Sequence, residues 1–296
     1  MTLDAYDPPV WEGVLTLDKP PGETSRDVVN RVARLLPRKV KVGHAGTLDP
    51  MATGVLVVCV GSATRLIEYV QRMPKTYRSI FRLGARSDTY DVDGVVVPTI
   101  DPRIPDLAGI ETALATQVGD VMQLPPAYSA LKVDGRRAYE LARAGETVVL
   151  EPRPVRIDGI RILGYDWPAL EVEVRCGGGT YIRSIAHDLG EALGCGAVME
   201  ALVRTRIGGF VLEDALDPDE LDRDALGDLL RPPLDAVAYL PRVALDDAAL
   251  AEVRLGRKVP GEAEPGAEVA LIGPDGRLIA LGEADGLLIQ PRKVLA

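Results

Sequence analysis

The organisation of this sequence follows from residues 42–61, which are Val42-Gly43-His44-Ala45-Gly46-Thr47-Leu48-Asp49-Pro50-Met51-Ala52-Thr53-Gly54-Val55-Leu56-Val57-Val58-Cys59-Val60-Gly61. The glycines permit close backbone approaches, while Pro50 fixes its own φ and disfavours helical geometry at Asp49. The apolar run after Gly54 predicts a buried strand. The stretch therefore predicts a stiff loop that enters the core and holds the carboxylate of Asp49 and the imidazole of His44.

Two interpretations of Asp49 are open on this stretch alone. An Asp before Pro in a glycine-rich loop commonly bonds nearby backbone N–H groups and does no more than shape a turn. A rigid loop is also where a protein can hold a reactive group in place. The remainder of the chain has to decide between the two.

Composition places the chain among ordinary water-soluble proteins. It has 296 residues, 47% hydrophobic and 26% charged, which suits one large domain and a small one. The longest apolar run, residues 55–60, is too short to cross a bilayer, and the N-terminus lacks the parts of a signal peptide. We therefore expect a cytoplasmic protein with no membrane partner, in which residues 1–9 form a loose tail.

Neither a metal site nor a disulfide framework is indicated. The three cysteines are widely spaced without a Cys-x-x-Cys pair, and the chain has only two histidines, His44 and His187. No phosphate-binding Gly-Lys-Ser/Thr loop is present either. We expect no metal and no cofactor.

The net charge of −10 hides an uneven distribution. Residues 26–86 contain twelve Lys or Arg against three Asp or Glu, whereas residues 211–296 contain nine basic against eighteen acidic residues. A basic region of this kind is an electrostatic footprint for phosphate, although some of these arginines also fit a solvated helix face.

The segments around the loop predict alternating strands and helices. We expect a strand over 13–17, a helix from Thr24 or Ser25 to about residue 36, a helix over 63–72 and a strand over 75–83. Tyr77 begins the apolar face of that last strand. It is either a core aromatic with its hydroxyl at the rim or a residue on which a base stacks.

Three carboxylates follow, at Asp88, Asp91 and Asp93. Asp91-x-Asp93 offers oxygen ligands for a divalent cation, and a polar turn between strands is the alternative. A helix is expected over 107–115. Next comes a basic, proline-flanked segment from residue 123 that leads into a short helix ending at Gly145.

The second half of the main domain predicts further strands and helices. Strands are expected between residues 148 and 167, with turns at 152–154 and 158–159, and over 170–176 and 201–207. Thr180 is expected to cap a helix that carries Arg183 in its first turn. Arginine is unfavourable there on helix-dipole grounds, which suggests a carboxylate partner, although an exposed side chain remains possible. An acidic helix over 217–230 and a linker from 231–233 complete this half.

The last segment has a different pattern. From about Pro241 we expect a helix near 246–255, and short strands over 269–272, 277–281 and 287–289 joined by Asp-Gly turns. This pattern predicts a small, separate β-rich domain.

Six motifs in this order resemble the TruB-type tRNA pseudouridine synthases, over nearly the whole chain. They are Leu17-Asp18-Lys19-Pro20 with Gly22 and Thr24-Ser25, the stretch from Gly43 to Gly54, Lys75-Thr76-Tyr77-Arg78, Pro126-Ala127-Tyr128-Ser129-Ala130-Leu131-Lys132, Gly179-Thr180-Tyr181-Ile182-Arg183 with Asp188-Leu189-Gly190, and Leu202-Val203-Arg204.

The resemblance implies a fold and a domain organisation. The fold is α+β, a mixed and mainly antiparallel sheet with flanking helices, plus a small β-rich C-terminal domain of the PUA type. Residues 1–235 correspond to the catalytic domain, with an insertion at about 124–150 that closes over RNA, and residues 236–296 to the PUA-like domain.

The resemblance also implies an activity and a site. The family isomerises a uridine in the T-loop of tRNA, normally position 55, to pseudouridine. Asp49 corresponds to the catalytic aspartate, Tyr77 to the tyrosine that stacks on the base and Arg183 to the arginine that pairs with the aspartate. The remaining positions are substrate-binding candidates: Leu202 at the pocket floor, His44 in base extrusion, Lys19 in the motif bracing the loop, and Thr47.

This chemistry suits those residues. Breaking C1′–N1 and joining C1′ to C5 is an isomerisation, so no redox cofactor is needed, and the stacked base must first be flipped out. Burial would raise the pKa of a carboxylate, and a nearby guanidinium would lower it again. Whether Asp49 attacks C1′, adds to C6 of the base or removes a ribose proton is left open. The expected partner is the T-arm of tRNA, bound by a monomer without an obligate protein partner.

The sequence differs from the family pattern in two places, and two other classes of function are also considered. Val203 replaces the first of two basic residues that the last motif often carries, and the terminal domain is acidic, which questions its contribution to RNA affinity.

A non-catalytic RNA-binding or RNA-folding protein would use the same basic face. A metal-dependent hydrolase would use Asp88, Asp91 and Asp93.

Overall fold

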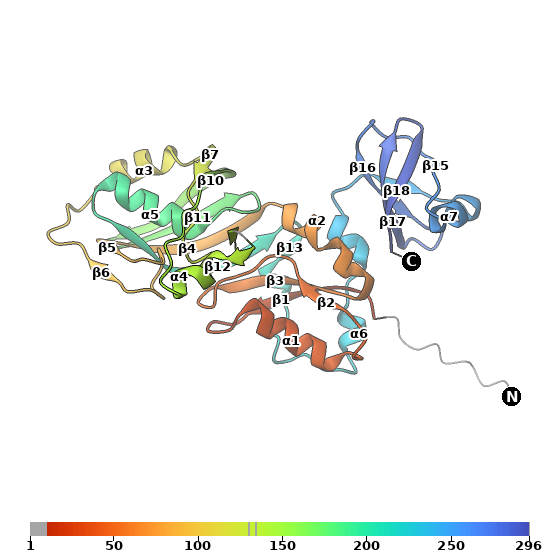
Figure 1. Cartoon of the computed structure of the whole chain (residues 1–296), viewed down its shortest axis with the longest axis horizontal. Coiled ribbons are helices and arrows are strands. Elements are labelled where there is room, and N and C mark those ends of the chain that lie inside the picture. Colours follow the sequence, from red (N-terminus) through yellow and green to blue (C-terminus); the bar gives the residue numbers. More distant parts are fainter. Residues whose placement is uncertain (1–10, 130, 134, 296) are drawn as a thin grey trace.

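The computed structural model describes residues 11–129, 131–133 and 135–295. Within these ranges the chain forms one large mixed sheet flanked by helices and a smaller sheet near the C-terminus (Figure 1). The predicted tail over residues 1–9 lies outside the described residues, as do Ala130 and Asp134 of the predicted insertion. No helix in the described part is both long and apolar enough to span a membrane.

The larger sheet has the order β1-β3-β12-β4-β11-β10-β7, with β2 paired to β3 and β13 to β12. Every neighbouring pair is antiparallel except β3 and β12, which run parallel and place Arg204 opposite Gly54. The expected mixed, mainly antiparallel sheet is confirmed. Its strands are β1 (Gly13–Lys19), β2 (Val42–His44), β3 (Thr53–Val60), β4 (Lys75–Leu83), β7 (Gly119–Gln123), β10 (Arg153–Asp166), β11 (Ala169–Cys176), β12 (Ala197–Ile207) and β13 (Phe210–Val211).

Helix α1 (Ser25–Leu35) covers the β1–β3 part of the sheet. Its N-cap is Thr24, whose side chain accepts from the Asp27 N–H while the Asp27 carboxylate accepts from the Thr24 N–H. Val28, Val29 and Val32 are buried against apolar residues of β1 and β3. Burial of each such side chain contributes about 1.5–3 kcal/mol.

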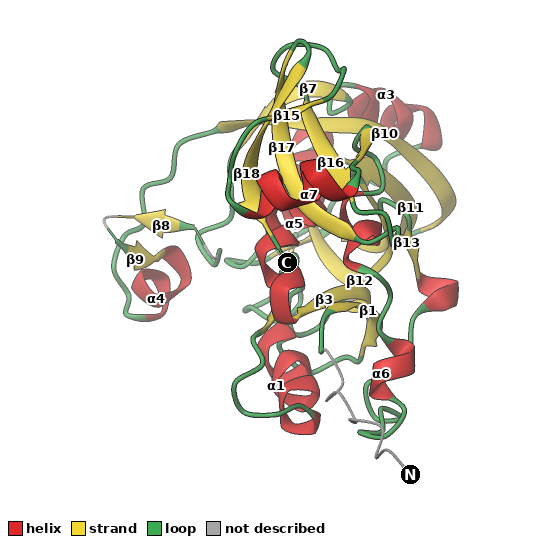
Figure 2. Cartoon of the chain, turned by 90° about the vertical axis from the view of Figure 1, so that its right-hand side faces the viewer, coloured by secondary structure: helices red, strands yellow, loops and turns green. Residues whose placement is uncertain are grey.

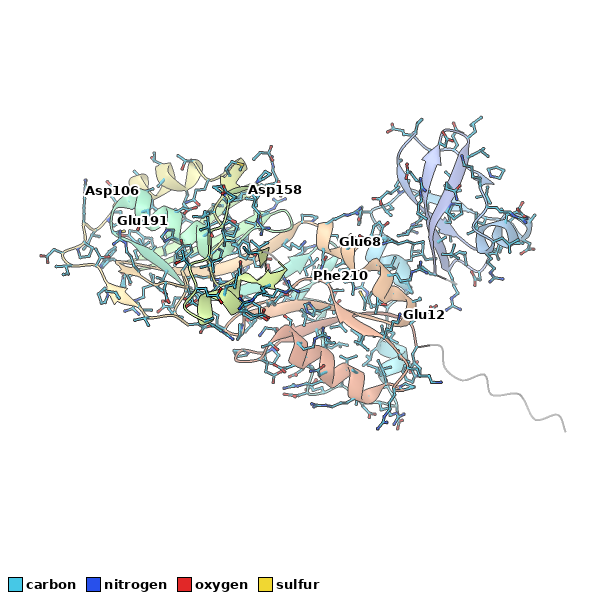
Figure 3. The ribbon with its side chains drawn as sticks, in the orientation of Figure 1. Glu12, Glu68, Asp106, Asp158, Glu191 and Phe210 are labelled. Atoms are coloured by element: carbon cyan, nitrogen blue, oxygen red, sulfur yellow. The ribbon has the colours of Figure 1, made fainter. Side chains whose placement is uncertain are left out.

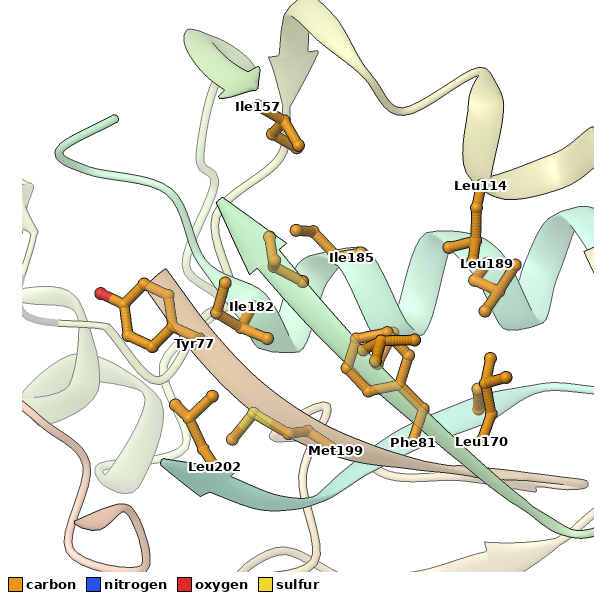
Figure 4. Close-up of a cluster of buried hydrophobic side chains, with 14 of the residues drawn as sticks. Tyr77, Phe81, Leu114, Ile157, Leu170, Ile182, Ile185, Leu189, Met199 and Leu202 are labelled. Atoms are coloured by element: carbon orange, nitrogen blue, oxygen red, sulfur yellow. The ribbon is translucent and has the colours of Figure 1, made fainter. Parts of the chain in front are cut away.

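Helices α3 (Leu107–Ala115) and α5 (Ile182–Leu193) cover one face of β4, β11 and β12 (Figure 1). The buried residues of β4 alternate from Tyr77 to Leu83, as period two predicts. Figure 4 shows the resulting core, in which Phe81, Leu170 and Met199 of the strands meet Ile185 of α5. Tyr77 and Leu202 lie at one end of this cluster.

Short elements connect these layers. They are the 3₁₀ helices η1 (Gly61–Leu66), η2 (Leu212–Asp214) and η3 (Pro233–Val237), the helices α2 (Ile67–Arg72), α4 (Ala138–Arg143) and α6 (Leu226–Leu229), and the two-stranded ribbons β5 (Ala85–Arg86) with β6 (Val97–Pro98) and β8 (Lys132–Val133) with β9 (Arg136–Arg137). The helix expected over 63–72 therefore begins as a 3₁₀ helix.

The C-terminal sheet (Figure 2) has the order β14-β16-β17-β18-β15. It has its own apolar core. Its elements are β14 (Arg242–Ala244), α7 (Asp247–Arg254), β15 (Val259–Pro260), β16 (Glu268–Ile272), β17 (Leu278–Asp285) and β18 (Leu288–Val294). Ion pairs join it to the larger unit, Lys293 with Glu68 and Arg277 with Glu12; both glutamates are labelled in Figure 3. The expected hairpins and the helix near 246–255 are confirmed.

Three local expectations are wrong for reasons visible in the backbone. Only α6 is helical within 217–230, because the chain first pairs along β1 and the Asp217 side chain then accepts from the Asp219 N–H, which favours a turn. The segment at 231–233 is not a free linker, since Arg231 exchanges two backbone hydrogen bonds with Val14. β10 begins at Arg153, within the first predicted turn, and continues through the second at 158–159 because a register shift between Ile157 and Gly159 absorbs the extra residue.

Thr180 does not cap α5. Its hydroxyl donates to the Gly177 carbonyl at 3.2 Å, and the cap position belongs to Tyr181, which makes no side-chain cap. The Tyr181 N–H instead donates to Gln123 Oε1 at 2.8 Å, so β7 anchors the start of the helix that carries Arg183.

Candidate active site

A cavity of about 880 Å³ opens where the Asp49 loop (residues 45–53), the start of α5 and the middle of β12 converge. Part of the predicted insertion at 124–150 forms another wall. The residues that line this cavity include Thr47, Asp49, Tyr77, Thr89, Asp91, Asp93, Tyr128, Ser129, Tyr139, Arg143, Tyr181, Ile182, Arg183, Leu202 and Arg204. Five of the seven predicted site residues line this cavity, namely Thr47, Asp49, Tyr77, Arg183 and Leu202, and they come from segments far apart in the sequence.

Asp49 and Arg183 form a two-point ion pair on the cavity wall. Arg183 Nε lies 3.0 Å from Asp49 Oδ2, and Nη2 lies 3.2 Å from Oδ1. This fork fixes the plane of the carboxylate as well as its charge. The Arg183 side chain is nearly inaccessible at 6%, whereas 34% of the Asp49 side chain is exposed. The carboxylate is therefore held from behind and presented to the cavity.

The rest of the Arg183 guanidinium is also occupied. Nη1 lies 3.2 Å from Asp91 Oδ2 and donates to the Thr89 carbonyl at 3.0 Å, and Nη2 donates to the Tyr128 carbonyl at 3.1 Å. Asp91 is 3% exposed and its Oδ1 accepts from the Thr89 hydroxyl at 2.5 Å. Sequence reasoning missed this role of Asp91, which it considered only as a cation ligand or a turn residue.

These contacts also bear on the metal-dependent alternative. The Asp91 carboxylate is engaged by Arg183 and Thr89, and Asp88 accepts from the Val95 N–H. Within the described ranges, no group of three or more His, Cys, Asp or Glu could hold a metal ion.

The electrostatics of Asp49 reflect two opposed effects. Burial raises the pKa of the carboxyl above its ordinary value, the Arg183 guanidinium opposes that rise, and Asp91 and Asp93 add to it. Asp91 shares the Arg183 guanidinium with Asp49, and Asp93 adds a further negative charge nearby. The net direction is upward, so Asp49 is a more basic carboxylate than an exposed aspartate.

Lys19 braces the Asp49 loop without entering the cavity. Its buried ammonium donates to the carbonyls of Pro20, Glu23 and Pro50 at 2.7, 2.6 and 3.1 Å. Burial lowers the pKa of this amine, and Glu23 opposes that shift. Pro50 directly follows Asp49, so this contact holds the backbone beside the carboxylate.

Arg204 braces the loop from the opposite side. It is 1% exposed and is the largest fully buried side chain in the described part of the chain. Its Nε donates to the Val55 carbonyl at 2.7 Å and its Nη2 to the Gly46 carbonyl at 3.1 Å, and its positive charge acts on the nearby Tyr77 hydroxyl, tending to lower the pKa of that group. One side chain thus joins the two ends of the Asp49 loop to each other. Arg204 lies two residues after the buried Leu202 on the same strand, so its side chain lies on the same face, and this alternation could have located it in the sequence.

The predicted base-holding residues lie together. Tyr77, Leu202 and Ile182 are buried at the cavity end of the core and all three line the cavity (Figure 4). Burial raises the pKa of the Tyr77 hydroxyl, and the positive charge of Arg204 opposes that rise. An aromatic face and two aliphatic side chains suit a planar, apolar-faced ring.

The two remaining candidates differ in position. Thr47 is exposed and lines the cavity. His44 ends β2 outside the described lining, and its Nδ1 is buried without a partner. Burial, together with Arg26 and Arg204, lowers the pKa of His44, so its imidazole is neutral at pH 7.

Two domain models of one protein family match this part of the chain. The N-terminal domain of the TruB family of pseudouridylate synthases matches residues 34–182, and the C-terminal domain of tRNA pseudouridylate synthase B matches residues 183–236. The chain belongs to the TruB family. The matched ranges contain the Asp49 loop, Tyr77, Arg183 and Leu202, so the family assignment and the cavity concern the same part of the chain.

Curated TruB relatives are similar over most of the chain. The tRNA pseudouridine synthase B of Dehalococcoides mccartyi is 44% identical over 251 residues, which is 83% of this chain and 83% of that protein. The protein of the same name from Thiobacillus denitrificans is 42% identical over 288 residues, 96% of each. A solved H/ACA RNP bound to a substrate RNA containing 2′-deoxyuridine has a chain that is 26% identical, with a TM-score of 0.73 over 99% of this chain and 92% of that one. This TruB-family chain is therefore a pseudouridine synthase, which is an isomerase, and it has the fold that its motifs predicted.

Proposed function

We propose that this TruB chain isomerises the uridine at position 55 in the T-loop of tRNA to pseudouridine, with Asp49 as the nucleophile. The observation that carries the proposal is the Asp49–Arg183 pair, which faces a cavity lined by Tyr77 and Leu202. The names of the relatives support tRNA as the substrate.

The cavity suits a flipped nucleotide. A uridine inside a folded T-arm must leave its stack before a protein carboxylate reaches it. Tyr77 and Leu202 then hold the base, while Asp49 attacks at C1′ of the ribose or at C6 of the base. In the overall change the C1′–N1 bond breaks, the C1′–C5 bond forms, C5 loses a proton and N1 gains one. Atoms and electrons balance without an added reactant.

The same proposal assigns the two units. Residues 1–235 form the catalytic domain, and the insertion at 124–150 closes over RNA, since Tyr128, Tyr139 and Arg143 already line the cavity. Residues 236–296 form a PUA-like RNA-binding domain. We propose that the protein acts in the cytoplasm as a monomer on the T-arm of tRNA and needs no protein partner.

One experiment tests both the nucleophile and the target. Unmodified tRNA and an isolated T-stem-loop RNA are incubated with the wild-type chain and with Asp49→Asn, and pseudouridine is mapped at nucleotide resolution. We expect modification at position 55 by the wild type and none by the variant, with RNA affinity retained. Asp120→Asn removes an exposed carboxylate on β7 and should behave as wild type. Unchanged turnover in Asp49→Asn would reject the nucleophile, and modification only at other uridines would reject the target.

A further inference from the structure

Ser129 carries a buried hydroxyl without a partner, and it does so on the wall of the cavity. Five buried side-chain atoms lack a hydrogen-bond partner in the described residues: Thr16 Oγ1, Glu23 Oε2, His44 Nδ1, Ser129 Oγ and Arg153 Nε. Ser129 is the member of this set whose residue lines the cavity, and it is 3% exposed. A buried polar group of this kind costs stability unless something else satisfies it.

The backbone around Ser129 is fixed rather than loose. The carbonyl of Tyr128 accepts from Arg183 Nη2 at 3.1 Å, and this same nitrogen lies 3.2 Å from Asp49 Oδ1. The Ser129 carbonyl accepts from the Tyr139 N–H at 3.0 Å. Ser129 is therefore one residue away from a carbonyl that shares a guanidinium nitrogen with the reactive carboxylate.

We propose that Ser129 supplies a hydrogen bond to the target nucleotide. The inference rests on the proposed function, because it takes the occupant of the cavity to be a uridine. The bound nucleotide completes the hydrogen bonding of Ser129 Oγ, and the resulting contact links the insertion directly to the reacting group.

The chemistry of a hydroxyl suits this position. A seryl hydroxyl donates one hydrogen bond, accepts others and rotates freely, whereas an amide or a carboxylate presents a fixed edge. Uridine joins its ribose through N1, and pseudouridine does so through C5, so the base turns in the pocket and presents different donors and acceptors before and after. A group that both donates and accepts stays bonded through that turn.

Steady-state kinetics on a T-stem-loop RNA, together with thermal unfolding of the full chain, test this role. Ser129→Ala should lower kcat/KM by about ten-fold, the worth of one neutral hydrogen bond. Its melting temperature should not fall, because the hydroxyl has no protein partner to lose. Ser129→Cys should lose nearly as much activity, since a thiol of similar size is a weak donor.

Ser184→Ala is the matched control. Ser184 is fully buried on α5, and its hydroxyl donates to the Leu124 carbonyl at 2.8 Å. This variant should show the opposite pattern, a lower melting temperature with kcat/KM per folded molecule near wild type.

The outcomes separate the two proposals. A kcat/KM for Ser129→Ala within two-fold of wild type would overturn the role of Ser129, as would a loss of activity that follows a loss of stability. Absence of pseudouridine with the wild-type chain would instead overturn the proposed function.

Discussion

Arg183 holds Asp49 through two nitrogens, with Nε 3.0 Å from Oδ2 and Nη2 3.2 Å from Oδ1. The same guanidinium lies 3.2 Å from Asp91 Oδ2, whose side chain is 4% exposed. Arg183→Met should therefore lower the free energy of unfolding by about 3–5 kcal/mol, mainly because it leaves the Asp91 charge buried and unpaired. Turnover should fall by ~10²-fold or more, because Asp49 loses its orientation. Urea unfolding and single-turnover assays measure the two effects.

Arg161→Met provides the control for that substitution. Arg161 pairs with Glu173 at 3.1 Å, but its side chain is 65% exposed. Its loss should change the free energy of unfolding by less than about 0.5 kcal/mol. Equal effects of the two substitutions would contradict the buried network around Arg183.

The pH dependence of activity should report the pKa of Asp49. Burial raises this pKa, and the rise is only partly opposed by Arg183. If the ionised carboxylate is the nucleophile, kcat/KM falls as the pH drops through this raised pKa, so the acid limb lies above that of an ordinary aspartate. A limb at or below the ordinary value near 3.8 would contradict the assignment.

The raised pKa of Asp49 should also affect stability, but here a rise in pH is unfavourable, whereas it favours activity. The folded chain binds the Asp49 proton more tightly than the unfolded chain does, so ionisation of Asp49 lowers stability as the pH rises from the unfolded pKa to the raised folded one. Asp49→Asn removes this dependence. The unfolding free energy of the variant relative to wild type should therefore increase across this window and level off above it, as denaturant titrations at several pH values would show.

Sequence predicted those parts of the site that local patterns encode. The Asp49 loop follows from its glycines and proline, and the alternation of β4 places Tyr77 on the buried face. The resemblance of the Arg183 motif to the family implied that Arg183 pairs with Asp49, and the structure contains this ion pair. Helix α1 and its Thr24 cap follow from local spacing as well.

Asp91 could not be found in this way, because only tertiary structure brings it to α5. The loop before it lies against β12 through hydrogen bonds that Tyr90 and Val92 exchange with Met199. No periodicity within 87–93 encodes that register. The same limit explains Ser129, whose place on the cavity wall depends on Arg183 and Tyr139. The acidic segment over 217–225 shows the reverse error, since its composition favoured a helix, whereas Leu216 just before it pairs with β1 and the Asp217 side chain then favours a turn.

Arg204→Met should destabilise the two ends of the Asp49 loop. The substitution leaves the Val55 and Gly46 carbonyls without their guanidinium donors at 2.7 and 3.1 Å. We expect a fall of about 2–3 kcal/mol in the free energy of unfolding, because two buried acceptors lose their partner. Arg206→Met on the same strand removes an exposed guanidinium and should stay within about 0.5 kcal/mol of wild type. Denaturant unfolding of both variants decides the matter, and similar losses would rule out a special role for Arg204.

Gly54→Ala should be among the most damaging single-methyl changes in the chain, because two costs coincide there. Gly54 has a φ of +98°, and a Cβ on it would lie 2.3 Å from the Arg204 carbonyl oxygen and 2.9 Å from the Arg204 backbone nitrogen. Those atoms belong to β12 and cannot move without disturbing its parallel pairing with β3. Gly286→Ala shares the positive φ, at +69°, but meets nothing within 4 Å, so it should cost only about 1 kcal/mol of strain. The excess loss in Gly54→Ala over Gly286→Ala, measured by urea unfolding, isolates the contact with Arg204. Equal losses would mean that β3 and β12 approach each other less closely than the parallel register requires.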